Sequence, residues 1–183
     1  MSVLRRFAVL LTALACASLI VVSPTPAQAA TKKRDPHDAP WAIDTRLVRL
    51  YQNWKGTVTV QMFSDTYNAG KKFNGLDVYY DTSGNNKADY RVHWGFTKDG
   101  DGYSDFGLFK VKGTKILKRV RCPGLSAKGR KKVRNIEVYV PRSCMKIKKR
   151  VRIYTLTWDY TKYRKGQPKR GRSDRAPNRG MLR

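Results

Sequence analysis

From Leu47 onward, apolar and polar residues alternate along most of the chain with a period of two. This period is typical of β-strands that bury one face, because successive side chains of a strand point to opposite sides of the sheet. Clusters of Gly, Asn, Asp and Lys separate the alternating segments and indicate turns. The apolar positions are Val58, Val60 and Met62; Leu76, Val78 and Tyr80; Tyr90, Val92, Trp94 and Phe96; Leu108 and Val111; Ile136, Val138 and Val140; and Val151, Ile153, Leu156, Trp158 and Tyr160.

The number and spacing of these segments indicate the fold class. Seven or eight strands in about 120 residues, with no helical period between them, favour an antiparallel arrangement. Glu, a strong helix former, occurs only at position 137, whereas the other 12 of the 13 acidic residues are Asp. We therefore predict one all-β domain, an antiparallel β-sandwich of immunoglobulin-like or jelly-roll-like type, over residues 42–161. A single short helical turn is expected at 141–144.

The first 30 residues have the features of a secretory signal peptide. Two arginines precede an almost entirely apolar run, and the small-x-small sequence Ala27-Gln28-Ala29 is typical of a cleavage site. A membrane anchor is the alternative, but the run is shorter than the ~20 residues of a span and a Ser-Pro-Thr-Pro sequence follows it. We expect residues 1–30 to be removed and the mature protein to be extracellular, without a transmembrane span. Residues 31–41 are expected to be a flexible lead-in.

Cys122 and Cys144 are the two cysteines outside the expected signal peptide. An even pair in an exported chain predicts a disulfide. Closing a loop of about 20 residues stabilises a fold by roughly 3 kcal/mol. A metal site or a catalytic thiol is the competing interpretation, but the only histidines, His37 and His93, have no ligand spacing to either cysteine.

Positive charge dominates the composition and lies in the second half of the chain. The sequence has 39 Lys+Arg against 13 Asp+Glu, a formal net charge of +26, which predicts attraction to polyanions. The net charge is +1 over residues 31–109 and +23 over residues 110–183. The last segment, 162–183, is basic and almost without apolar residues, so we expect it to be a disordered cationic tail. The hydrophobic fraction of 40% still supports one globular core.

The basic residues of the second half are the candidate polyanion-binding residues. On a strand, Arg150 and Arg152 point to the same side, opposite Val151 and Ile153, so that a sheet can present a positive face. Solvated charge kept for solubility is the competing interpretation. The candidates are Lys118, Arg119, Arg121, Arg130, Lys131, Lys132, Arg134, Arg150, Arg152, Lys169, Arg170 and Arg172.

An Asx-rich turn between two expected strands is a candidate calcium site. Asp81, Ser83, Asn85 and Asp89 have the spacing of oxygen ligands in many calcium loops. An EF-hand is excluded, because its twelfth position would be Val92 and the flanking segments are strands. The sequence is also that of a hairpin turn, which needs no ion. Both interpretations stay open, and calcium is the only cofactor that the sequence suggests.

The chain offers few groups for catalysis. His93 is the one histidine within the expected domain, on a strand between Val92 and Trp94, where a lone histidine is usually a surface residue. No Ser-His-Asp set or histidine pair for a metal is available. We therefore expect a protein that is not an enzyme.

Several segments resemble a group of small secreted proteins of unknown function from high-GC Gram-positive bacteria. They are Leu76–Asp81 running into Ala88–Val92, Val120–Cys122, and Val138–Cys144 with its Val-Pro-Arg-Ser-Cys sequence. The group commonly has Leu after this last cysteine, where this chain has Met145. The strand-Asp-turn-Asp-Tyr segment also resembles DOMON and carbohydrate-binding sandwiches. The resemblance implies a paired-cysteine β-sandwich and does not imply a ligand.

Two functions follow from these features as hypotheses. The first is a secreted, non-enzymatic protein that adheres to cell-envelope phosphates, acidic polysaccharide or an anionic lipid surface through its basic half, and that binds nucleic acid nonspecifically in vitro. The second is a calcium-stabilised carbohydrate-binding or interaction module.

Overall fold

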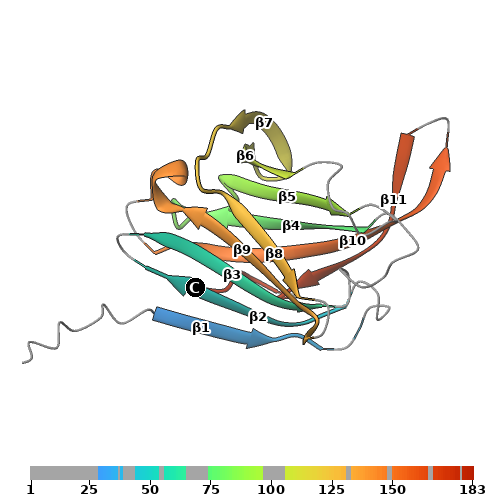
Figure 1. Cartoon of the computed structure of the whole chain (residues 1–183), viewed down its shortest axis with the longest axis horizontal. Helices are drawn as coiled ribbons and strands as arrows, with labels where there is room; N and C mark the ends of the chain where they lie inside the picture. Colours follow the sequence, from blue (N-terminus) through green and yellow to red (C-terminus); the bar gives the residue numbers. More distant parts are fainter. Residues whose placement is uncertain are drawn as a thin grey trace, which may run out of the picture.

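The computed structural model is a two-layer β-structure with almost no helix (Figure 1). It describes residues 29–36, 38, 44–53, 56–64, 74–96, 106–130, 133–147, 150–164, 167–177 and 179–183. The expected signal peptide falls almost entirely outside these residues, and its removal stays a prediction. The strands are β1 (Ala29–Arg34), β2 (Thr45–Gln52), β3 (Thr57–Ser64), β4 (Asn74–Asp81), β5 (Tyr90–Phe96), β6 (Phe106–Lys112), β7 (Lys115–Val120), β8 (Ser126–Arg130), β9 (Asn135–Pro141), β10 (Arg152–Arg164) and β11 (Gln167–Ala176).

The strands form two antiparallel sheets that pack face to face. One sheet has the order β1-β2-β3-β9-β8 and the other has the order β11-β10-β4-β5-β6-β7. A short 3-10 helix, η3 (Arg142–Met145), follows β9 where the sequence predicts a helical turn. The all-β sandwich with one disulfide is thus confirmed.

The core lies between the sheets and is built from the alternating residues of the interior strands. In β3, for example, Val58, Val60 and Met62 are fully buried while their neighbours are only partly covered. On the outer face of the second sheet the indole of Trp158 lies directly on Gly75, where a Cβ atom would come within 1.9 Å of the ring. Position 75 therefore has to be glycine, because a side chain there would overlap the indole of Trp158. The main cluster includes Val48, Leu50, Leu76, Val78, Tyr80, Val92, Trp94, Leu108, Ile136, Val138, Val140, Met145 and Ile153.

The predicted flexible lead-in and disordered tail are wrong where the structure describes them. Residues 31–34 belong to β1, which pairs with β2, and β11 pairs with β10. Both strands lie outside the predicted domain of 42–161 and form edges of the two sheets. Their sequences lack an apolar alternation, because an edge strand is held mainly by backbone hydrogen bonds to one neighbour.

The segment after β11 is anchored in the core. Leu182 is 5% exposed, and it exchanges two backbone hydrogen bonds of 2.8 Å with Ile153. Ala176 is completely buried at the end of β11. Two apolar residues and a backbone bridge therefore hold a segment whose composition indicated disorder.

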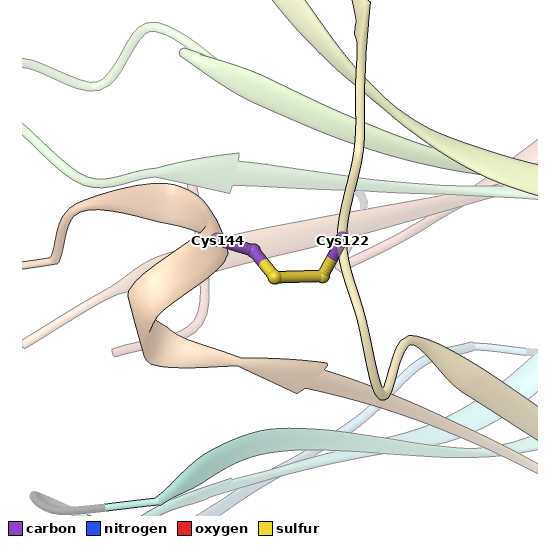
Figure 2. Close-up of a disulfide and its surroundings, with 2 residues drawn as sticks. All are labelled: Cys122 and Cys144. Carbon is purple, nitrogen blue, oxygen red and sulfur yellow. A yellow bond between two sulfur atoms is a disulfide. The ribbon is translucent and has the colours of Figure 1, made fainter.

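The disulfide between Cys122 and Cys144 is present (Figure 2). It joins the connection between β7 and β8 to η3, and the two residues are 22 positions apart. Both cysteines pack against the main core cluster. A disulfide that closes a loop of this length stabilises a fold by about 3 kcal/mol. It lies at the end of the sandwich where β7 of one sheet connects to β8 of the other.

Candidate functional site

Within the described residues, the predicted polyanion-binding residues lie in separate parts of the fold. Lys118, Arg119 and Arg121 lie on β7 and just after it, at the edge of the six-stranded sheet. Arg130 ends β8 and Arg134 lies just before β9, while Arg150 lies two residues before β10 and Arg152 begins it. Lys131 and Lys132 lie outside the described residues, as do the side chains of Lys169, Arg170 and Arg172 on β11.

The β6–β7 hairpin brings lysines together in directly opposed pairs. Lys110 faces Lys118, and Lys112 faces Lys115. All four side chains are exposed, and no ion pair with an acid is recorded for them in the described part of the chain. Like charges placed directly opposite each other destabilise a strand pair. Sequence reasoning missed three of these lysines, because their pairing depends on a register shift next to Val111.

Arginines and aromatic rings alternate across the outer face of the six-stranded sheet. Arg119, Phe109, Arg91, Tyr79 and Tyr154 are successive cross-strand partners. The guanidinium of Arg91 lies 6.0 Å from the ring centres of both Tyr79 and Phe109, and that of Arg119 lies 5.8 Å from Phe109. The tyrosine rings are stacked at 4.5 Å. These cation–π contacts hold Arg91 and Arg119 in place.

The expectation that His93 is a surface residue is wrong. It is 9% exposed, because it lies between the indole of Trp158, stacked at 5.5 Å, and the fully buried carboxylate of Asp77. Its Nδ1 atom lies 2.6 Å from Oδ1 of Asp77, and Nε of Arg91 lies 3.2 Å from the same oxygen. Asp77, Arg91 and His93 thus form a buried polar cluster on adjacent strands, and it contains the ion pair between Arg91 and Asp77.

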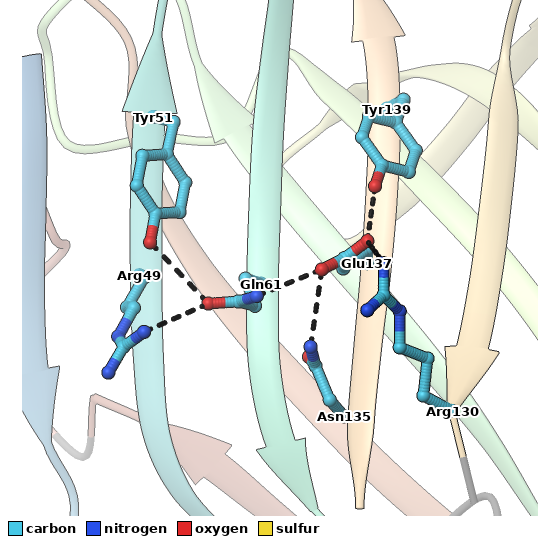
Figure 3. A network of polar contacts seen from close by, with 7 residues as sticks. All are labelled: Arg49, Tyr51, Gln61, Arg130, Asn135, Glu137 and Tyr139. Atoms are coloured by element: carbon cyan, nitrogen blue, oxygen red, sulfur yellow. Dashed lines mark hydrogen bonds and ion pairs between the residues drawn. The ribbon is translucent and has the colours of Figure 1, made fainter. Parts of the chain in front are cut away.

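The only glutamate of the chain organises a polar network on the outer face of the five-stranded sheet (Figure 3). Glu137 accepts hydrogen bonds from Gln61, Asn135 and Tyr139, and Arg130 lies 3.8 Å away. Partial burial opposes ionisation, but the hydrogen bonds from Tyr139 and Gln61 and the charge of Arg130 outweigh it and lower the pKa of this carboxyl. Arg130 is therefore partly neutralised, unlike the lysines of the β6–β7 hairpin.

The candidate calcium loop has the hydrogen bonds of a self-contained turn. Asp81 accepts from the backbone N–H groups of Ser83, Gly84, Asn85 and Asn86, at 2.6–3.3 Å. Asp89, the fourth predicted ligand, accepts from the backbone N–H groups of Thr82 and Ser83. The side-chain oxygen of Asn85 accepts from the backbone of Lys87. These contacts favour the hairpin-turn interpretation, and calcium binding is left without support from this geometry.

A second group of acids was not predicted. Asp35, Asp38 and Asp174 each place a carboxylate oxygen within 4.8 Å of the others. Asp174 is 5% exposed and accepts a 2.7 Å hydrogen bond from the backbone of Thr45, so it connects β11 to β2. Burial, together with the charges of Asp35, Asp38 and Asp44, raises its pKa to about 6 despite the hydrogen bond from Thr45.

This raised pKa predicts that acidic conditions stabilise the contact between β11 and β2. Between about pH 4 and pH 6 the folded chain holds a proton on Asp174 that the unfolded chain has released, so stability falls as the pH rises through this range. The full contribution is about 3 kcal/mol. In urea unfolding, Asp174→Asn is expected to be more stable than the wild type at pH 7 and equal to it at pH 4. If Asp174→Asn and the wild type are equally stable at both pH 7 and pH 4, the raised pKa of Asp174 is contradicted.

Two further findings bear on function. The described residues contain no helix long and apolar enough to cross a membrane. Comparison of the chain with protein-family models, curated proteins and solved structures finds no match.

Proposed function

We propose that this protein is a secreted, non-enzymatic binding protein that adheres to anionic polymers through its basic second half. Phosphate polymers of the cell envelope are the favoured partner class; acidic polysaccharide, anionic lipid surfaces and nucleic acid are the alternatives that a binding test separates. The signal-like sequence of residues 1–30 and the +23 charge of residues 110–183 support this proposal.

The opposed lysines of the β6–β7 hairpin carry the proposal. Lys110 and Lys118, and Lys112 and Lys115, repel each other across the strand pair. A hairpin selected only for stability would gain by placing an acid in either pair. The same pairs place four ammonium groups on one short hairpin, which is the arrangement that a chain of phosphates can bridge.

Protection of an exposed edge is a simpler explanation for some of this charge. Lysines on an edge strand discourage pairing with another chain, and β7 is an edge. Edge protection needs a charge, most often a lysine in natural sheets, whereas binding of a polyanion needs a positive charge. The two explanations therefore differ in the sign of the charge that they require.

A single charge reversal tests this difference. Lys118→Glu places opposite charges across the pair with Lys110, so we expect the free energy of unfolding to rise by a few tenths of a kcal/mol. Retention on an immobilised phosphate polymer is expected to fall. The matched control is Lys33→Glu, an equal change of charge at an exposed position on β1. If both variants lose the same retention, the hairpin has no special part in binding.

A carbohydrate-binding module is the second candidate. The network around Glu137 presents the half-buried rings of Tyr51 and Tyr139 beside Gln61 on one sheet face (Figure 3). Aromatic rings beside amide and carboxylate groups suit a neutral sugar. This candidate is favoured over the first if the protein binds neutral glycans independently of salt and if a calcium chelator lowers its melting temperature.

A further inference from the structure

A pocket lies beside the turn that the sequence marks as a candidate calcium loop. It has a volume of about 430 Å³, which falls in the range of small-ligand sites. Three separate parts of the chain line it: the β4–β5 turn, the residues at the start of β10, and the end of the described chain. The lining residues are Thr82, Ser83, Gly84, Arg150, Arg152 and Arg183.

The charged side chains among the lining residues are those of three arginines, Arg150, Arg152 and Arg183. The acids of the adjacent turn, Asp81 and Asp89, direct their oxygens to backbone N–H groups of the turn, including those of Gly84 and Thr82. The guanidinium groups of Arg150 and Arg183 have no recorded ion pair within the described residues. The pocket is therefore suited to an anion.

Arg152 is held in position at the pocket. Its Nη1 atom donates a 2.5 Å hydrogen bond to the side-chain oxygen of Asn86, on the same turn. Its Nη2 atom lies 3.8 Å from the point that a Cβ atom of Gly84 would occupy. Gly84 has a φ of +82°, a conformation that favours glycine and leaves this space open. A guanidinium fixed in this way is pre-organised for paired hydrogen bonds to oxyanions.

The two hydroxyl groups of the pocket have a different role. The Thr82 hydroxyl donates to Asp89 at 2.9 Å, and the Ser83 hydroxyl donates to Asp81 at 3.2 Å. Because each hydroxyl has one proton, both oxygens keep lone pairs that can accept a further hydrogen bond. A ligand that satisfies the whole lining therefore carries an oxyanion for the arginines and a hydroxyl donor for Thr82 and Ser83.

From this combination we infer that the pocket binds a phosphorylated polyol, through its phosphoryl group at the arginines and its hydroxyl groups at Thr82 and Ser83. The inference rests on the proposed function and names the repeating unit that the protein recognises, since a polyol phosphate is the repeating unit of one class of anionic polymer. The β6–β7 hairpin then contributes general attraction, and the pocket contributes recognition of a single unit.

Isothermal titration of the full chain with three small molecules tests the inference. Glycerol 3-phosphate is expected to bind, inorganic phosphate to bind more weakly, and glycerol not to bind. Arg152→Gln is expected to weaken glycerol 3-phosphate at least about tenfold, because it removes a charged hydrogen-bond donor. The matched control, Arg34→Gln, removes one charge from an exposed position on β1 and is expected to leave the affinity within about twofold.

If the wild type does not bind glycerol 3-phosphate, the assignment of the pocket as a binding site is wrong. It is also wrong if Arg152→Gln and Arg34→Gln lose the same affinity. Equal affinity for phosphate and glycerol 3-phosphate overturns the role of the hydroxyl oxygens. Arg152→Lys, which keeps the charge and loses the fork, separates geometry from charge, and melting curves confirm that each variant is folded. If the wild type shows no salt-dependent retention on the polymer but still binds glycerol 3-phosphate, the proposed function is wrong and the pocket assignment stands.

Discussion

Deletion of residues 167–183 is expected to unfold the domain. The deletion removes β11 from the edge of β10 and takes Leu182 out of the core. Loss of a buried leucine costs about 2–5 kcal/mol, and β10 also loses its backbone hydrogen bonds to β11. A typical domain is stable by only about 5–15 kcal/mol, so losses of this size are enough to unfold it.

Urea unfolding of the truncated chain, followed by circular dichroism, measures this loss. Leu182→Ala is the milder variant and is expected to lower the free energy of unfolding by about 2–5 kcal/mol. Its neighbour Met181, which is only half-buried, is the control, and Met181→Ala is expected to have a smaller effect. A truncated chain with the wild-type urea midpoint would show that the C-terminal segment is a free arm after all.

Asp77→Ala is expected to be the most damaging single substitution in the six-stranded sheet. Asp77 is fully buried, and the side chain of its partner Arg91 is 9% exposed. Removing the carboxylate leaves a guanidinium buried without this counterion, which typically costs about 3–5 kcal/mol. The stacked pair of His93 and Trp158 loses the group that fixes the imidazole. Thermal and urea unfolding at neutral pH measure the effect.

A double variant separates loss of the ion pair from loss of packing. If the cost of Asp77→Ala comes from the unpaired guanidinium, then adding Arg91→Met is expected to restore part of the stability. The two changes would then be strongly non-additive. Additive losses, or a loss below about 1 kcal/mol for Asp77→Ala, would show that this cluster does not hold the sheet together.

The interior strands could be predicted from the sequence, whereas the edge strands could not. Val58, Val60 and Met62 alternate because one face of β3 is covered by the opposite sheet. In contrast β1, β7, β8 and β11, which form the four sheet edges, were not predicted. All side chains of Lys115–Arg119 on β7 are exposed, so burial imposes no period on this strand. Its position is fixed instead by hydrogen bonding to β6, which leaves no trace in the apolar pattern.

The candidate site was predictable in its charge and not in its arrangement. The basic second half indicated attraction to anions, and Arg150 and Arg152 were identified as a pair on one side of a strand. Arg183 was not, because it reaches the same pocket only through the bridge between Leu182 and Ile153. A contact between residues so far apart in the chain depends on sheet order, which local spacing does not encode.

The salt dependence of binding to a phosphate polymer is a direct measure of whether the β6–β7 hairpin binds the polymer. Each ammonium group that replaces a counterion adds to the slope of log affinity against log salt concentration, by about 0.7 for a single-stranded polyanion. We expect a steep slope for the wild type and a decrease of about 3 when Lys110, Lys112, Lys115 and Lys118 are all changed to Gln. An unchanged slope in this variant, with the fold intact, would contradict the claim that the β6–β7 hairpin binds the polymer.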